Sequence, residues 1–282
     1  MGNLLIVGLL LIVNISYAGG TQWWLTSMGQ TTEGKYIFES KSQTNYLTFG
    51  LMGRGERWTF SINVPYIYQK NGAFTQFSEI VIPADEMDQN DNSGMHGGNH
   101  NQDPVPDEII IIEETIIPKP EHGIGDIYLF GNYKILGKTR SPLGIFLNTQ
   151  VKIPFASFDK GLGSGEFDYG LSISFKQSIQ TFSLFSDIGF LVLGDSDEFK
   201  YKDPLTWGLG FGKSFNRGKY YTMVYYQQYT KIIEAFEPPR QLSFGINYRI
   251  SSKMFISIGW QRGFSETTPD NGLSGGIQWT IN

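Results

Sequence analysis

Apolar and polar residues alternate along much of this chain. Residues 167–176 read Phe-Asp-Tyr-Gly-Leu-Ser-Ile-Ser-Phe-Lys, with an apolar side chain at every odd position and a polar, small or charged residue at every even one. Successive side chains of a β-strand point to opposite faces, so the segment predicts a strand with one apolar and one polar face. The alternation recurs in 143–154, 240–250 and 254–262, and less regularly in 125–136.

The pattern predicts about twelve strands, each close to the 9–11 residues that a transmembrane strand needs. In 21–30 and 220–229 it does not assign the two faces. The even number agrees with bacterial single-chain barrels. The expected strands are 21–30, 44–53, 57–69, 125–136, 143–154, 167–176, 181–192, 205–215, 220–229, 240–250, 254–262 and 271–281.

The connections between these strands alternate between short and long. Short turns are expected at 53–56, 137–142, 177–180, 216–219 and 251–253, and long connections at 31–43, 71–124, 156–166, 194–204, 231–239 and 264–270. Tight periplasmic turns and longer outer loops are typical of outer-membrane barrels. The fold class expected is therefore all-β: a transmembrane antiparallel up-and-down β-barrel in the bacterial outer membrane, in contact with its lipid and folded by the barrel assembly machinery.

Charged residues of the strands fall mainly on the polar phase. A charge facing the lipid midplane costs roughly 2–4 kcal/mol, which a lumen-facing charge avoids. Lys213 is the exception, on the outward phase but near a turn. All six tryptophans lie near expected strand ends, as the aromatic girdles of barrels do. The candidate lumen-lining residues are Asp126, Asn132, Lys134, Asn148, Gln150, Lys152, Asp168, Asp187 and Arg249. They either hold water and opposing charges along a solute path or satisfy one another as a closed polar network.

The beginning of the chain resembles an export signal. Residues 4–13 are apolar, and Ser-Tyr-Ala at 16–18 fits a small-x-small cleavage site, so 1–18 is expected to be a signal peptide and 19–282 the barrel. The apolar run is too short for a spanning helix. The slightly negative mean hydropathy of −0.21 agrees with strands that face a wet lumen on one side. A net charge of −5 gives no basic footprint for nucleic acid.

One connection, 71–124, is much longer than the others and is expected as an extracellular loop. Residues 84–107 are rich in Asp, Asn, Gly and His, whereas the flanks 77–83 and 108–118 are β-prone and predict a protruding hairpin. His96 and His100 are weak candidates for a divalent metal site. A solvated polar tract is the simpler interpretation, and no metal or other cofactor is expected.

Catalytic patterns are weak. Gly161-Leu-Gly-Ser-Gly165 has no helix pattern after it, so it favours a flexible rim rather than a phosphate-binding loop. His122 is the histidine closest to a strand, and no Gly-x-Ser-x-Gly motif lies near it in the sequence. Glu113 and Glu114 are adjacent and would face opposite ways on a strand. An enzyme is therefore not expected.

Several segments in order resemble one family. They are 61–66 (Ser-Ile-Asn-Val-Pro-Tyr), the Gly-x-Gly-Asp run within 123–133, Lys-x-Pro at 152–154, the glycine-rich 160–169 and 268–276. This arrangement is similar to the outer-membrane transporter-like family named for the meta-pathway of phenol degradation. The resemblance covers most of the chain after residue 18 and implies an outer-membrane barrel, sometimes encoded near aromatic-compound catabolism. It implies no catalytic residues.

The function expected is a narrow outer-membrane channel or transporter for small, hydrophobic or aromatic solutes. Two alternatives stay open at this point: a surface-exposed structural or adhesion barrel that acts through its long loop, and, less favoured, an outer-membrane enzyme.

Overall fold

A computed structural model describes residues 20–35, 41–70, 74–77, 80–83, 120–137, 141–195 and 201–281 of the chain. The expected signal peptide and most of the long connection, including 84–107 with His96 and His100, lie outside these residues. No helix in the described ranges is long and apolar enough to cross a membrane.

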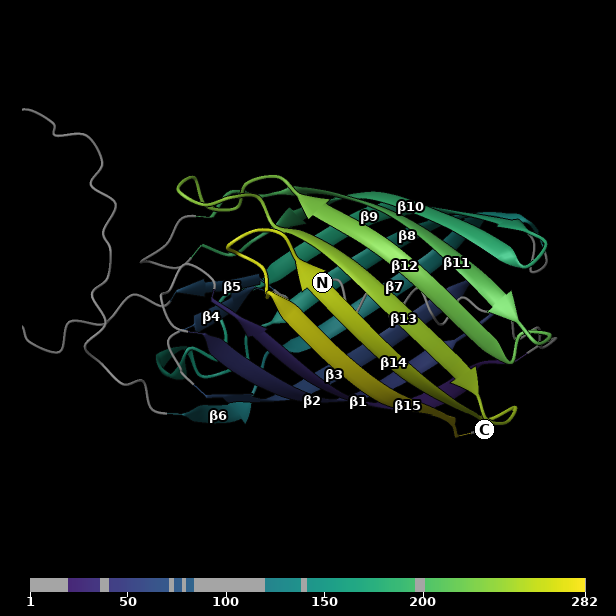
Figure 1. The fold of residues 1–282 in the computed structure, drawn as a ribbon, viewed down its shortest axis with the longest axis horizontal. Coiled ribbons are helices and arrows are strands. Elements are labelled where there is room, and N and C mark those ends of the chain that lie inside the picture. The colour runs from purple at the N-terminus through teal and green to yellow at the C-terminus, as the bar shows by residue number, and fades with distance from the viewer. Residues whose placement is uncertain are drawn as a thin grey trace, which may run out of the picture.

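The described chain is almost entirely β-structure (Figure 1). A short hairpin, β4 (Phe74–Phe77) and β5 (Ile80–Pro83), forms a sheet of its own, and η1 (Phe158–Lys160) is a single 3₁₀ turn. The strands of the main sheet are β1 (Gln22–Gly34), β2 (Ser42–Arg54), β3 (Trp58–Gln69), β6 (Glu121–Ile124), β7 (Ile127–Leu136), β8 (Leu143–Ile153), β9 (Asp168–Ile179), β10 (Phe182–Val192), β11 (Leu205–Phe215), β12 (Tyr220–Tyr229), β13 (Arg240–Arg249), β14 (Met254–Gly263) and β15 (Asn271–Thr280).

The main sheet closes on itself. Each strand is antiparallel to its neighbours, and β1 pairs with β2 on one side and with β15 on the other, so no edge remains. Both β6 and β7 pair with β3, which makes them two halves of one wall strand interrupted at Gly125 and Asp126. The thirteen strands of the sheet therefore form a wall of twelve. The predicted closed antiparallel barrel of about twelve strands is confirmed.

Some predicted boundaries differ from the structure. The turn expected at 177–180 lies at 180–181, because β9 continues to Ile179, which pairs with Phe182. Residues 121–124, expected within the long connection, form β6 in the wall. The flanks 77–83 and 108–118 were expected to form a protruding hairpin; 108–118 lies outside the described residues, and β5 pairs with β4.

The two faces of the wall differ in composition. Large apolar side chains on the outward face are well exposed, as for Leu209 (59%), Ile258 (61%) and Leu273 (63%). An apolar surface of this extent on a closed barrel suits acyl chains rather than water. Ionisable side chains on the outward phase of the described wall strands lie close to strand ends, and Lys213 is among them, as predicted. They are Glu33, His122, Lys213, Arg240 and Arg262.

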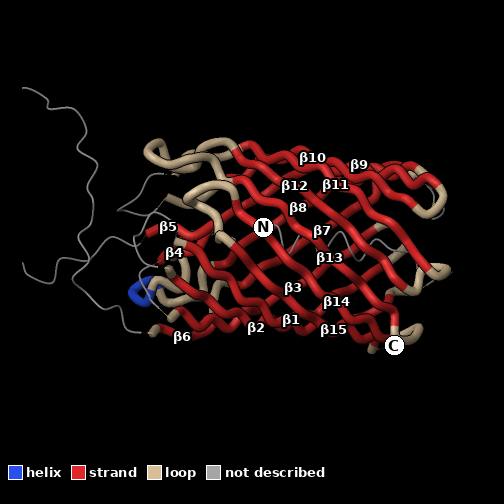
Figure 2. The backbone as a smooth tube through the Cα atoms, in the orientation of Figure 1, coloured by secondary structure: helices blue, strands red, loops and turns tan. Residues whose placement is uncertain are grey.

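The two ends of the barrel also differ, since turns gather at one end and long loops at the other (Figures 1 and 2). Outward tryptophans lie near both ends: Trp23, Trp58 and Trp279 at the short-turn end, and Trp207 and Trp260 towards the long loops. Trp24 departs from this pattern, because its side chain is buried inside the barrel. Outward tryptophans near both ends match aromatic girdles at two membrane interfaces.

Candidate functional site: the barrel interior

The structure places the side chains of the nine candidate lumen-lining residues on the inward face of the wall. Five of them are buried: Asp126, Gln150, Lys152, Asp168 and Asp187. The other four, Asn132, Lys134, Asn148 and Arg249, are half-buried. The alternation along each strand therefore located the side chains, although it could not tell which of them touch.

An ion-pair cluster of Asp126, Lys152 and Asp168 lies inside the barrel near the long-loop end. The Lys152 ammonium is 2.7 Å from Asp168 Oδ2 and 3.8 Å from Asp126 Oδ2, and its side chain is fully buried. Lys152 and Asp168 are direct partners across β8 and β9, whereas Asp126 arrives from the break between β6 and β7. Breaking such a buried pair leaves a charge without compensation, which makes the cluster a strong local constraint.

The ion-pair cluster holds the loop 154–167 against the inside of the wall. Asp126 Oδ1 accepts hydrogen bonds from the backbone N–H groups of Phe155 and Ala156, both at 3.0 Å. The Lys152 ammonium donates to Ser164 Oγ. From β3, the strand next to β6 and β7, the Gln69 amide donates to the Gly161 carbonyl of the loop at 3.2 Å. The loop thus folds inward at the mouth of the barrel.

The glycine-rich run within this loop fits closely against the wall. Gly161 and Gly165 adopt positive φ angles of 63° and 74°, as expected for a run that lets the backbone turn. A Cβ on Gly163 would lie 2.7 Å from the Asp126 carboxylate, and one on Gly123 would lie 3.0 Å from Leu162 Cδ1. The Gly-x-Gly-Asp, Lys-x-Pro and glycine-rich segments, far apart in the sequence, therefore meet in one place.

A ladder of amide and hydroxyl groups crosses β7, β8 and β9 at mid-depth. Asn132 Nδ2 donates to Asn148 Oδ1 at 2.6 Å, and Asn148 Nδ2 lies 2.6 Å from Ser174 Oγ and 3.1 Å from Ser172 Oγ. Here the candidate residues satisfy one another, as in the closed-network alternative.

Two tyrosines that the sequence did not assign, Tyr221 and Tyr225, lie on the inward face of β12. The Tyr225 hydroxyl of β12 reaches across β11 and donates to the Asp187 carboxylate of β10. The Tyr225 side chain fits because Gly208 lies beneath it: a Cβ on residue 208 would be 1.9 Å from Tyr225 Oη. Tyr221 covers Gly212 in the same way, since a Cβ on residue 212 would be 2.1 Å from Tyr221 Oη. The sequence signal for these inward tyrosines was the run of glycines in β11 beside the aromatic residues of β12. Because 220–229 has no regular alternation, the sequence did not show which residues of β12 face inward.

Beside Tyr225, several buried polar atoms have no protein partner. They are Gln227 Nε2, Ser243 Oγ, Asn247 Nδ2 and Gln261 Oε1, on the inner faces of β12, β13 and β14. Buried polar groups are normally hydrogen-bonded, so unpaired groups of this kind point to contact with water or a solute. On this side, the interior is not a self-satisfied polar network.

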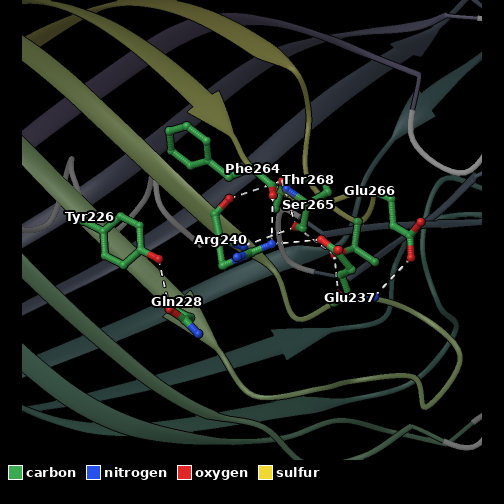
Figure 3. A network of polar contacts seen from close by, with 9 residues as sticks. Tyr226, Gln228, Glu237, Arg240, Phe264, Ser265, Glu266 and Thr268 are labelled. Atoms are coloured by element: carbon green, nitrogen blue, oxygen red, sulfur yellow. Dashed lines mark hydrogen bonds and ion pairs between the residues drawn. The ribbon is translucent and has the colours of Figure 1, made fainter.

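The long loops interlock above the mouth. Arg240 donates to Glu237 at 2.9 Å and to the Phe264 carbonyl at 3.1 Å, while Glu266 accepts from the Glu237 backbone N–H (Figure 3). An apolar cluster of Leu191, Leu193, Tyr201, Tyr229 and Ile232 packs where the loop 230–239, which also carries Glu237, meets the loop after β10. At the surface of these loops, the hydrogen bond from Lys202 lowers the pKa of the Glu234 carboxylate. These contacts join the loops 230–239 and 264–270 and the described residues of the loop after β10.

No group of three or more potential metal-ligating side chains occurs within the part of the chain that the structure describes. His122 lies on the outer face, where its Nδ1 is 2.7 Å from the Tyr66 hydroxyl. The weak metal candidates His96 and His100 fall outside the described residues.

A model of the family described as "Putative MetA-pathway of phenol degradation" matches residues 72–281. A search of curated proteins found no match. Among solved structures, the fold is similar to the COG4313 outer membrane channel from Pseudomonas putida F1, with a TM-score of 0.63 at 11% identity over 95% of this chain and 97% of that one. It is also similar to the KdgM porin, with a TM-score of 0.50 at 8% identity over 92% and 99% of the two chains.

Proposed function

Since this chain belongs to the phenol-degradation MetA-pathway family, we propose that it is an outer-membrane channel for small hydrophobic or aromatic solutes. The observation that carries the proposal is the separation of the two faces of a closed wall. The buried charged side chains Asp126, Lys152, Asp168 and Asp187 point inward, whereas the outward face is lined by exposed large apolar side chains. A protein in water has no need for this inversion, whereas a barrel in lipid requires it.

The difference between the two ends of the barrel indicates how it is oriented in the outer membrane. Short turns mark the periplasmic side of such barrels and long loops the outer side, so the ion-pair cluster lies towards the cell exterior. The apolar band contacts outer-membrane lipid, and a barrel of this type is folded into the membrane by the barrel assembly machinery.

The interior supports a narrow path rather than a wide pore. Barrels of about eight strands are filled by their own side chains, and those of 16–18 strands leave an aqueous channel, so twelve strands are intermediate. Tyr221 and Tyr225 occupy part of the interior, and the loop 154–167 narrows the mouth. The buried, unpaired polar atoms of Gln227, Ser243 and Gln261 lie on the inner faces of β12, β13 and β14 and could bind water beside this path.

Electrical recording tests the proposal. Purified protein inserted into planar lipid bilayers should carry a steady current in potassium chloride. Benzyl alcohol added to one side should reduce that current reversibly, because its ring would occupy the narrow path, while the same concentration of glycerol should not. The absence of conductance from protein shown to be folded by its heat-dependent mobility in gels would refute a channel. Equal effects of the two alcohols would refute a preference for aromatic solutes.

A further inference from the structure

A second group of charges lies inside the barrel at the short-turn end, away from the ion-pair cluster. Arg54, Lys134, Lys176 and Arg249 all face inward within four residues of the short-turn ends of their strands. The inward carboxylates of the described wall are elsewhere: Glu121, Asp126 and Asp168 near the long loops, and Asp187 in the middle of β10. The interior is therefore positive at the end where the turns are short.

Three of these cations form a basic cluster: Arg54, Lys134 and Lys176. Lys134 and Lys176 lie on the two strands that flank β8, where their register partners, Phe146 and Gly144, are successive inward residues. Arg54 of β2 pairs with Thr59 of β3, which pairs with Asn132, the inward residue of β7 before Lys134. Within the described ranges, neither lysine has a carboxylate within ion-pair distance. Glu56, in the turn after β2, is the described acidic residue that acts on Lys134 through space. Like charges this close repel one another, and an anion bound among them would relieve the repulsion.

Aromatic rings lie beneath the two lysines. The Lys134 ammonium is 5.6 Å from the centroid of Phe146, its register partner on β8, and the Lys176 ammonium is 5.9 Å from the centroid of Phe185, its partner on β10. Both rings are buried, at 4% exposure. They hold the ammonium groups on a fixed apolar floor through cation–π contacts and leave the lysines half-buried on the interior surface.

The ring of Phe146 also extends towards the strand position that pairs with Lys176. This ring leans over Gly144, where a Cβ would lie 2.8 Å from Phe146 Cε2. Gly144 is the register partner of Lys176, so the ring reaches from the row of Lys134 towards the row of Lys176. Glycine at this position leaves room for the ring of Phe146 between the two rows.

We propose that the basic cluster is a binding and selectivity site for small aromatic carboxylates at the periplasmic end of the path. Rings of Arg and Lys side chains are the usual means by which pores select anions, and three inward cations supply that charge here. The aromatic part of the anion follows from the solute class of the proposed function. This inference rests on the proposed function and narrows its solute class from aromatic molecules to aromatic anions. A neutral pore of the same width would not need three cations in a row.

The test compares benzoate with benzylammonium, which have similar rings and opposite charges. Reversal potentials measured in planar bilayers with potassium chloride on one side and potassium benzoate or benzylammonium chloride on the other give the permeability of each organic ion. The intact protein should favour benzoate. Lys134→Met and Lys176→Met keep an apolar stem on each ring and remove the charge. Each should lower the benzoate-to-benzylammonium permeability ratio by about two- to fivefold, the range of a partly exposed charge pair.

Lys213→Met is the matched control. Lys213 lies near the same end of the barrel and packs over Phe182 at 4.7 Å and Phe215 at 5.0 Å, but on the outward face. Its replacement should leave the permeability ratio unchanged. An intact protein that conducts and is blocked by benzyl alcohol, yet does not favour benzoate, would overturn the basic site and leave the channel standing. A ratio that stays constant in both lysine variants, or falls equally in Lys213→Met, would also overturn the site. The absence of any conductance would overturn the site together with the channel.

Discussion

At the scale of single residues, the position of each charge follows from the solvent on its side of the wall. Lys152 is fully buried, yet it meets two carboxylates and a serine hydroxyl within the barrel. Lys213 faces outward near a strand end, where its stem can reach the interface and its ammonium lies over two rings. The same residue type thus serves opposite environments, and the environment decides what its loss would cost.

Replacing Lys152 should destabilise the barrel strongly. In Lys152→Met, two buried carboxylates lose their shared cation, so the free energy of unfolding should fall by roughly 3–5 kcal/mol. Equilibrium unfolding in guanidinium chloride, followed by tryptophan fluorescence in detergent micelles, measures this change. The control Lys213→Met removes only exposed cation–π contacts and should cost about 1 kcal/mol or less. Equal losses in the two variants would contradict the assignment of Lys152 to a structural ion-pair cluster.

Which residues face inward was predictable from the sequence, but which of them meet was not. The polar phase of 143–154 and 167–176 included Lys152 and Asp168, and only the register of β8 on β9 makes them partners. The link from Asp126 depends on a break between β6 and β7 that periodicity does not reveal. Tyr225 was missed because nearly every side chain of 220–229 is aromatic or polar, so alternation is lost there.

At the scale of strands and loops, alternation and connection length predicted most of the wall. The strands 205–215 and 220–229 have the predicted bounds, because a glycine-containing turn at 216–219 separates them. The turn between β9 and β10 was placed too early, since Gln177 and Ser178 look like turn residues but remain paired with β10. The inward course of the loop 154–167 was not predictable, because it depends on hydrogen bonds to Asp126, Lys152 and Gln69 from three different strands.

The outward face of a strand should tolerate a charge only near its ends. Leu209 is in the middle of β11 and Leu205 is its first residue, and both are outward and more than half exposed. Leu209→Arg should cost about 2–4 kcal/mol, and Leu205→Arg about 0–1 kcal/mol, because the cost depends on depth in the bilayer. Reversible folding into lipid vesicles measures both. Equal costs at the two positions would contradict a membrane-spanning β11.

At the scale of the whole molecule, closure joins these features into one path with two different ends. Pairing of β1 with β15 closes the sheet, so in the described part of the chain a path through the barrel would run between the long-loop end and the short-turn end. The outer opening is narrowed by the loop 154–167 and by the Arg240–Glu237 contacts, and the inner one carries the basic cluster. A solute would pass from an ion-paired mouth, beside the tyrosines, to a positive exit.

Cysteine accessibility tests this account most directly, since the chain has no cysteine of its own. Ser172 and Ile173 are neighbours at mid-depth on β9, with Ser172 on the inward face and Ile173 outward and 40% exposed. In planar bilayers, a negatively charged, membrane-impermeant methanethiosulfonate should react with Ser172→Cys and reduce its current, whereas the current of Ile173→Cys should not change because acyl chains cover the thiol. Loss of current in Ile173→Cys with none in Ser172→Cys would contradict a solute path enclosed by the barrel.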